Sequence, residues 1–95
     1  MADISVKDNP RRHRYEAVID GTVAGIAVYR LEDDHIVFTH TEVEPEFEGK
    51  GVGGALARAA LDDVRSKRDY DVVAQCPFIS AWIDKHPAYQ DLLAA

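Results

Sequence analysis

Two ionisable residues spaced two apart, His40 and Glu42, are the first candidates for chemistry in this chain. They lie in the run His35–Val43, whose β-branched and aromatic residues predict a strand, and residues two apart on a strand share a face. Strict alternation places Ile36 and Phe38 on that face too, so it changes from apolar to ionisable along the strand. An imidazole suits a general base near neutral pH, whereas a carboxylate needs burial or a bridging water.

A third candidate is Cys76, the one cysteine of the chain, which directly precedes Pro77. The short apolar run Asp71–Gln75 predicts a strand, and proline is favoured at the first position of a helix, so the thiol falls at a strand–helix junction. A helix start favours the thiolate, which is consistent with a nucleophile; an inert, half-buried cysteine is equally consistent. A single cysteine excludes an internal disulfide and a cysteine-based zinc site, and we predict no metal site.

The segment Glu48–Gly54, with the sequence EGKGVGG, holds four of the six glycines of the chain. It follows the predicted strand and opens into a helical pattern over Val52–Lys67. Glycine lets another molecule approach the backbone, and a helix start offers unpaired N–H groups and the positive end of the helix dipole. This order predicts an anion cradle, most often for phosphate; the alternative is a tight turn with close helix packing.

The elements predicted to position these candidate residues and the glycine segment form a small mixed sheet. Alternating or apolar runs predict strands at Ile4–Lys7, Tyr15–Ile19, Thr22–Leu31, His35–Val43 and Asp71–Gln75. Asp20-Gly21 predicts a hairpin turn between the second and third strands. A stripe of small apolar residues predicts the helix Val52–Lys67, and Pro77 begins a second helix whose aromatic stripe is expected in the core. We predict an α+β fold with a mostly antiparallel sheet of about five strands and two main helices.

Composition bounds the function. The 95 residues form one expected domain, 1–95, and the net charge of −6 argues against nucleic acid as a partner. The chain has no apolar run of membrane-spanning length, so we expect a cytoplasmic protein that does not bind membranes. The basic run Arg11–Arg14 is typical of a solvated turn; the functional alternative is a rim contact for an anionic ligand.

Two familiar phosphate loops do not fit the glycine segment. A Walker loop needs Ser or Thr after its lysine, but Lys50 is followed by Gly51. The spacing of Gly49, Gly51 and Gly54 matches a dinucleotide fingerprint. However, the preceding strands are hairpins and the chain is too short for a doubly wound sheet.

A third kind of loop fits the glycine segment better. The segment Glu48–Gly53 resembles motif A of the GNAT superfamily of N-acetyltransferases, R/Q-x-x-G-x-G/A, although its first residue here is Glu. The superfamily motif follows a strand and a proline, as the segment does here. His40–Val43, Cys76–Phe78 and Lys85–Tyr89 also resemble the very short YjdJ-type N-acetyltransferase-like proteins. The resemblance covers nearly the whole chain and implies a GNAT-like fold.

The resemblance also implies an activity, the transfer of an acetyl group from acetyl-CoA to a small amine or a protein amine. The base would be His40 or Glu42, since a carboxylate on the fourth strand often serves in the superfamily, and Cys76 would accept the acetyl group or lie beside the cofactor thiol. The alternative is a non-catalytic coenzyme A-binding sensor module. The residues expected to bind the cofactor are Val43, Gly49, Lys50, Gly51, Val52, Gly53 and Gly54.

Overall fold

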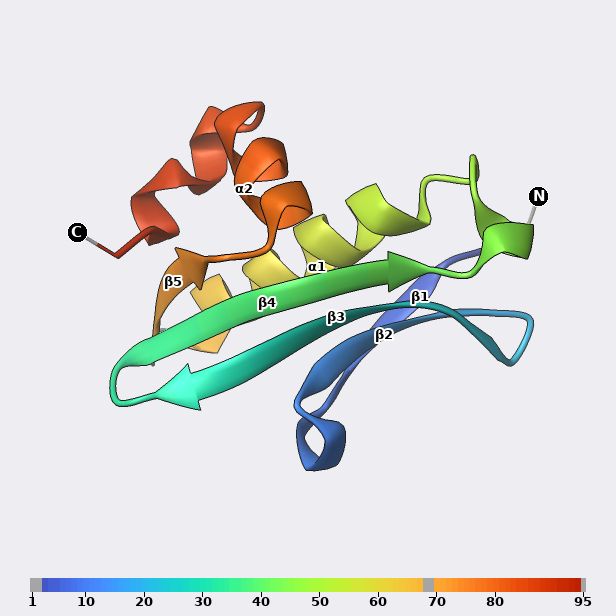
Figure 1. Cartoon of the computed structure of the whole chain (residues 1–95), viewed down its shortest axis with the longest axis horizontal. Helices are drawn as coiled ribbons and strands as arrows, with labels where there is room; N and C mark the ends of the chain where they lie inside the picture. The colour runs from blue at the N-terminus through green and yellow to red at the C-terminus, as the bar shows by residue number, and fades with distance from the viewer. Residues whose placement is uncertain (1–2, 68–69, 95) are drawn as a thin grey trace.

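The protein is a five-stranded sheet with one long helix packed on one face (Figure 1). The computed structural model describes residues 3–67 and 70–94. The strands are β1 (Ser5–Asn9), β2 (Arg14–Ile19), β3 (Thr22–Glu32), β4 (His35–Val43) and β5 (Asp71–Ala74). The helices are α1 (Val52–Lys67) and α2 (Pro77–Asp84), with short 3-10 segments η1 (Pro10–Arg12), η2 (Pro45–Phe47) and η3 (Pro87–Leu92). The predicted class and element order are confirmed.

The strands lie in the sheet in the order in which they occur in the chain. The first four pair antiparallel, and β5 pairs parallel to β4. The predicted hairpin joins β2 to β3 through Asp20 and Gly21, which both have positive φ angles of 49° and 79°. A parallel pair needs a crossover, and α1 supplies it between β4 and β5.

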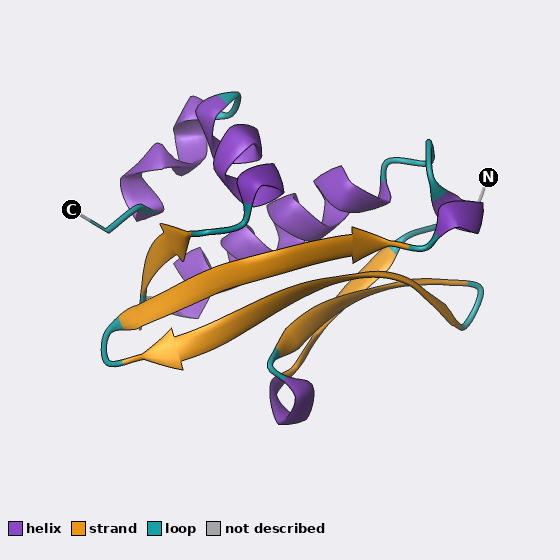
Figure 2. Cartoon of the chain, in the orientation of Figure 1, coloured by secondary structure: helices purple, strands orange, loops and turns teal. Residues whose placement is uncertain are grey.

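Helix α1 covers one face of the sheet with an apolar stripe that includes two alanines. It packs against β1, β2, β3 and β4, and its alanines allow a close approach to the strands. Its buried residues are Val52, Leu56, Ala57, Ala60, Leu61 and Val64. Figure 2 shows α1 behind the strands, with the face of β2 and β3 toward the viewer free of any covering helix. We call that uncovered side the open face.

Helix α2 and η3 close the core at the β5 edge. The predicted core packing of the aromatic stripe of α2 is confirmed for Ile79, Trp82 and Ile83, which are buried, but it is wrong for Phe78, which is 41% exposed. The hydroxyl group of Tyr89 in η3 donates a hydrogen bond to Asp62 Oδ1 of α1 at 2.7 Å. That hydrogen bond and burial both raise the pKa of Tyr89, which acts here as a packing residue.

One part of the predicted strand geometry is wrong. The β3–β4 register shifts between Phe38 and His40, which leaves one extra residue on β4. Their cross-strand partners, Tyr29 and Val28, are neighbours on β3 and therefore point to opposite faces. Such a bulge breaks the simple alternation. His40 and Glu42 share a face as predicted, but it is the open face, opposite to the face of Phe38.

Candidate functional site

Strand β5 leaves β4 partway along its length. The parallel ladder ends at the pair Phe38–Ala74, and the N–H groups of Gln75 and Cys76 then both donate to the carbonyl oxygen of Phe38, at 3.0 and 2.9 Å. Strand β4 continues to Val43 beyond the end of β5 (Figure 1). Among the described residues, the backbone of 39–43 has no β5 partner on this side. Such a strand edge can hydrogen-bond an extended ligand that carries amide groups.

The glycine loop leads from this free edge into α1. Gly49 and Gly51 have φ angles of 81° and 79°, a region that glycine occupies without steric cost. The N–H group of Ala55 donates to the carbonyl of Gly51 at 3.0 Å, which makes Gly51 the N-cap residue of α1. The N–H groups of the first helical turn have no intrahelical acceptor, so they and the helix dipole could attract an anion, and the anion cradle stays a prediction.

The two later glycines of the loop differ in what surrounds them. A Cβ atom on Gly53 would lie 2.8 Å from Cζ of Phe78, so this position lets α1 and α2 approach closely. A Cβ atom on Gly54 would lie 3.9 Å from Nε1 of Trp82, an ordinary contact distance. The four glycines of the loop therefore differ in role. Gly49 and Gly51 allow a positive φ angle, Gly53 allows close packing of the two helices, and Gly54 meets neither requirement.

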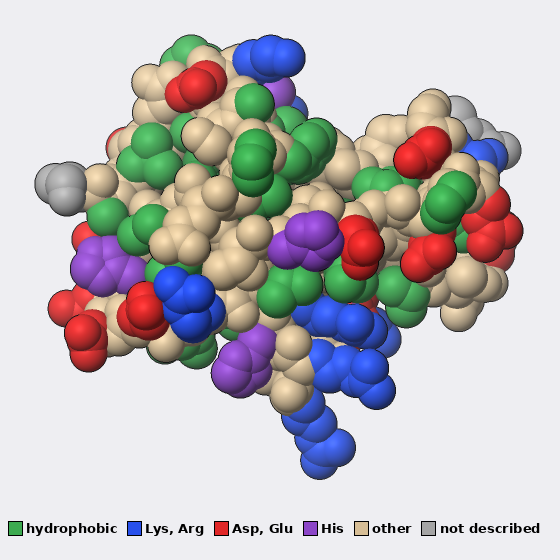
Figure 3. All heavy atoms as spheres, in the orientation of Figure 1, with side chains coloured by type: hydrophobic (Ala, Val, Ile, Leu, Met, Phe, Trp, Pro, Cys, Tyr) green, Lys and Arg blue, Asp and Glu red, His purple; other side chains and the backbone are tan. Residues whose placement is uncertain are grey.

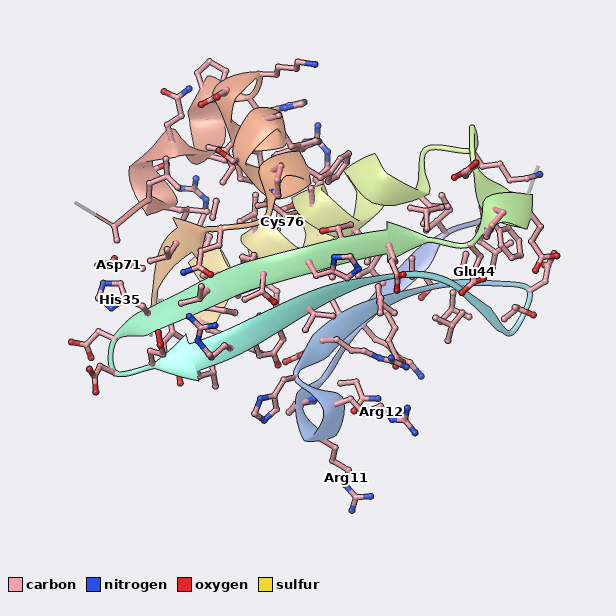
Figure 4. All side chains as sticks on the ribbon, in the orientation of Figure 1. Arg11, Arg12, His35, Glu44, Asp71 and Cys76 are labelled. Carbon is pink, nitrogen blue, oxygen red and sulfur yellow. The ribbon has the colours of Figure 1, made fainter. Side chains whose placement is uncertain are left out.

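Cys76 lies next to the free segment of β4 (Figure 4). It is 3% exposed, and its carbonyl accepts the hydrogen bond from Ser80 at 3.0 Å that begins α2, which places it at the N-cap position. Its Sγ atom lies 3.3 Å from Oγ1 of Thr41 on β4. Because Thr41 pairs with Ala27 on the helix side of the sheet, the thiol faces the same side as α1.

His40 and Glu42 lie on the other side of β4. Nε2 of His40 is 3.7 Å from Oε1 of Glu42, and their side chains are 59% and 67% exposed. The bulge in β4 thus separates the three predicted catalytic residues into a solvent-facing pair and a buried thiol. The edge of β4 at residues 39–43, which has no β5 partner, lies between them.

The remaining predicted residues lie around the loop. Val43 is partly buried against the core, while Lys50 and Glu48 are exposed. Glu48, the departure from the superfamily motif, directly follows η2. Within residues 3–67 and 70–94, no three His, Cys, Asp or Glu side chains gather in a way that would hold a metal ion. No helix of that part of the chain is long and apolar enough to cross a membrane.

Two residues of the site carry no recognisable signal in the sequence. Thr41 reaches Cys76 only because the register of β4 and β5 brings a β4 residue beside the start of α2. Phe78 covers Gly53 and is 41% exposed, although an aromatic residue in a helical stripe predicts simple core packing.

Comparisons with known proteins agree with this geometry. The family model described as GCN5-related N-acetyl-transferase matches residues 14–92. An NMR structure of a protein described as a GCN5-like N-acetyltransferase from Staphylococcus aureus has a TM-score of 0.72 and 24% identity, covering 100% of this chain and 92% of that chain. A crystal structure of a ribosomal-protein-alanine N-acetyltransferase from Brucella melitensis biovar Abortus 2308 has a TM-score of 0.58 and 20% identity, covering 86% of this chain and 61% of that chain.

A comparison with curated proteins finds no match. The likeness to the two solved structures shows the fold alone, because both are less than 25% identical to this chain. The predicted GNAT-like fold is confirmed, while the YjdJ-type subgroup stays a prediction.

Proposed function

Because the chain belongs to the family of GCN5-related N-acetyltransferases, we propose that it binds acetyl-CoA and transfers the acetyl group to an amine. The observation that carries the proposal is that the N-terminus of α1 and a free edge of β4 lie next to each other. The N-terminus of α1 follows two glycines with positive φ, and the strand that leads into it has a free edge. An acyl-CoA presents matching chemistry, since it has a diphosphate at one end and an amide-containing arm that ends in the thioester.

The diphosphate would bind the backbone of the loop, where the first-turn N–H groups and the helix dipole attract negative charge. The residues proposed for this role are those predicted from the sequence: Gly49, Lys50, Gly51, Val52, Gly53 and Gly54. The amide-containing arm would run along β4 past Val43. This path would bring the thioester toward Thr41 and Cys76. The exposed carboxylate of Glu48 would have to lie away from the diphosphate.

Transfer forms a C–N bond and breaks the thioester C–S bond. The attacking amine must be neutral, but less than about one in a thousand alkylamines with an ordinary pKa is neutral at pH 7. We assign the removal of its proton to His40 or Glu42, which lie on the accessible side of β4. The acceptor ammonium loses two protons in total: one protonates the departing thiolate of CoA and the other passes through the base to solvent.

A second route would use Cys76. Its thiolate would first take the acetyl group as an enzyme thioester and release CoA, and the amine would then attack that thioester. The close approach of Sγ to Thr41 at the diverging strands supports this route, whereas the exposure of His40 and Glu42 supports direct transfer.

A pair of variants tests the cofactor site. Gly51→Asn and Gly51→Asp introduce side chains of nearly the same shape, and both residue types tolerate a positive φ better than most. Only Asp adds a negative charge beside the cradle. Two diphosphate charges about 6 Å away would repel it by about 1.4 kcal/mol at the dielectric constant of water, which is a tenfold loss of affinity.

Titration calorimetry with CoA should therefore show Gly51→Asp binding about tenfold more weakly than Gly51→Asn. Equal affinities in the two variants would remove the loop from the site. Incubation of the wild type with acetyl-CoA and a panel of amines, followed by mass spectrometry, tests the transfer itself. Binding of CoA without any acetylated product would instead indicate the non-catalytic sensor module.

A further inference from the structure

The open face of the sheet carries a hollow of about 300 Å³ beside the solvent-facing pair of β4. It is lined by Arg14, Val23, Gly25, Ile26, Glu42 and Glu44. Figure 3 looks onto this face and shows acidic side chains on one side of an apolar strip and basic side chains on the other. The hollow lies on the side of β4 opposite to Cys76, and the cofactor loop does not line it.

The strand register explains this distribution of charge. Ile26 on β3 pairs with Glu42 on β4 and with Glu16 on β2, while Arg14 lies two residues from Glu16 on the same face. Neighbouring strands are about 4.8 Å apart, so the axes of β2 and β4 are separated by about 10 Å. The guanidinium group and the carboxylate thus rise from opposite sides of an apolar floor formed by Ile26.

The side chain of Arg14 is held in place by the neighbouring Glu16 on the same face of β2. Its Nε–H group donates to Oε2 of Glu16 at 2.9 Å, and the Glu16 side chain is only 7% exposed. Asn9 donates to the same oxygen at 3.2 Å. The hydrogen bond from Arg14 lowers the pKa of Glu16 against the opposing effect of burial, with Asn9 adding to it. A guanidinium group has five N–H donors, so this contact leaves its terminal N–H groups for an anionic ligand.

The acidic side of the hollow is positioned as well. Glu42 lies 3.7 Å from the imidazole of His40, as measured between Oε1 and Nε2. The N–H group of Glu44, labelled in Figure 4 just after β4, donates to the carbonyl of Ala24 at 2.8 Å. This hydrogen bond ties the end of β4 to β3, and Glu44 lines the hollow.

From this arrangement we infer that the acetyl acceptor is a small zwitterion, an amine that also carries a carboxylate, bound in the hollow on the open face. The inference rests on the proposed function. A simple anion would face two carboxylates there, and a simple cation would face a guanidinium group. A free amino acid places its ammonium near Glu42 and Glu44, its carboxylate near Arg14 and its methylene groups over Ile26.

The same placement brings the amine to the proposed base. Its nitrogen would lie beside His40 and Glu42 at the edge of β4, from which it can reach a thioester running along that edge. The ammonium gives up one proton before it attacks the carbonyl carbon. The second proton leaves as the tetrahedral species collapses to amide and CoA thiol.

The experiment compares two series of acceptors with acetyl-CoA. One series is glycine, β-alanine, 4-aminobutanoate and 6-aminohexanoate; the other is their primary amides, which keep the amine and the chain length but lose the negative charge. We expect at least one acid to be acetylated with a kcat/KM roughly fivefold or more above that of its amide. Binding of the preferred acid to the CoA-saturated protein, measured by calorimetry, should follow the same order.

Variants then test which residues bind the carboxylate and the ammonium group of the acceptor. Arg14→Gln should abolish the preference for the acid over the amide. Because that change leaves Glu16 buried without its charged partner, Arg14→Gln with Glu16→Gln serves as a second variant that removes both charges. Glu44→Gln should weaken both the acid and its amide, because each carries the ammonium group. Lys85→Gln on the exposed end of α2 is the matched control and should keep the preference.

The inference is overturned if the amides react as well as the acids, if the preference survives loss of Arg14, or if no acid binds the CoA-loaded protein at millimolar concentration. These outcomes differ from failure of the proposed function, which would appear as loss of CoA binding at the loop. Acetylation of simple amines without a preference for the carboxylate would sustain the proposed function and refute this inference alone.

Discussion

Gly25 on β3 lies beneath the first turns of α1, and replacing it with alanine tests how closely the helix start is packed onto the sheet. A Cβ atom here would lie 2.9 Å from the carbonyl oxygen of Glu42, 2.9 Å from Cγ1 of Val52 and 3.2 Å from Cδ1 of Leu56. Ordinary contacts begin at 3.4 Å. The carbonyl belongs to the neighbouring strand, and Val52 is buried and restricted at χ1, so neither can yield freely.

Adding atoms to a well-packed core costs about 1–3 kcal/mol. In a domain of this size 1 kcal/mol lowers Tm by about 4–8 °C, so Gly25→Ala should melt roughly 5–20 °C below the wild type. The matched control is Gly54→Ala, whose Cβ atom has room. Alanine is favoured over glycine in a helix by up to about 1 kcal/mol, so its Tm should equal or exceed that of the wild type.

Thermal unfolding followed by circular dichroism measures both variants, and urea midpoints provide an independent check. The close-packing argument is refuted if Gly25→Ala melts within about 2 °C of the wild type. It is also refuted if Gly54→Ala loses as much stability as Gly25→Ala. A destabilised Gly25→Ala protein should also bind CoA more weakly at a temperature where it is still folded, because Val52 begins the helix that forms the cradle.

Three further predictions concern side chains of the site. If Cys76 lies beside the thioester, saturating CoA should slow its alkylation by iodoacetamide severalfold, and an unchanged rate would exclude the covalent route. If His40 is the base, His40→Gln should lower the rate of acetyl transfer while CoA affinity is retained; an unchanged rate would transfer the role to Glu42 or water. Arg14 lowers the pKa of the Glu16 carboxyl in the folded protein. The pair therefore stabilises the folded state above about pH 4.3, the ordinary pKa of Glu in the unfolded chain, and this stabilisation is lost as the pH falls through the pKa of Glu16 in the folded state. Arg14→Gln should therefore unfold at a higher pH in an acid titration monitored by fluorescence, and an unshifted midpoint would contradict this.

The sequence alone determined the features that depend on neighbours along the chain. The bounds of α1 and β4 match the predicted ranges, because a 3.6-residue apolar stripe, a β-branched run and a terminating proline are all local signals. The Asp20-Gly21 hairpin and the N-cap position of Cys76 follow from the same kind of signal. The consecutive order of a strand, glycines and a helix start before α1 is also confirmed, while the anion-binding role predicted from that order stays a prediction.

The tertiary structure decided everything that depends on which strands and helices lie side by side. The bulge in β4 turns His40 away from the face of Phe38, and no local pattern marks it, because it is defined only by the pairing with β3. The contact between Cys76 and Thr41 joins residues 35 positions apart through the crossover of α1. The reasons for glycine at positions 51 and 53 are also tertiary. Gly51 has a positive φ angle, and Gly53 lies against Phe78 of the neighbouring helix. Side-chain alternation and helical periodicity describe one element at a time, whereas a site between elements is specified by register and packing.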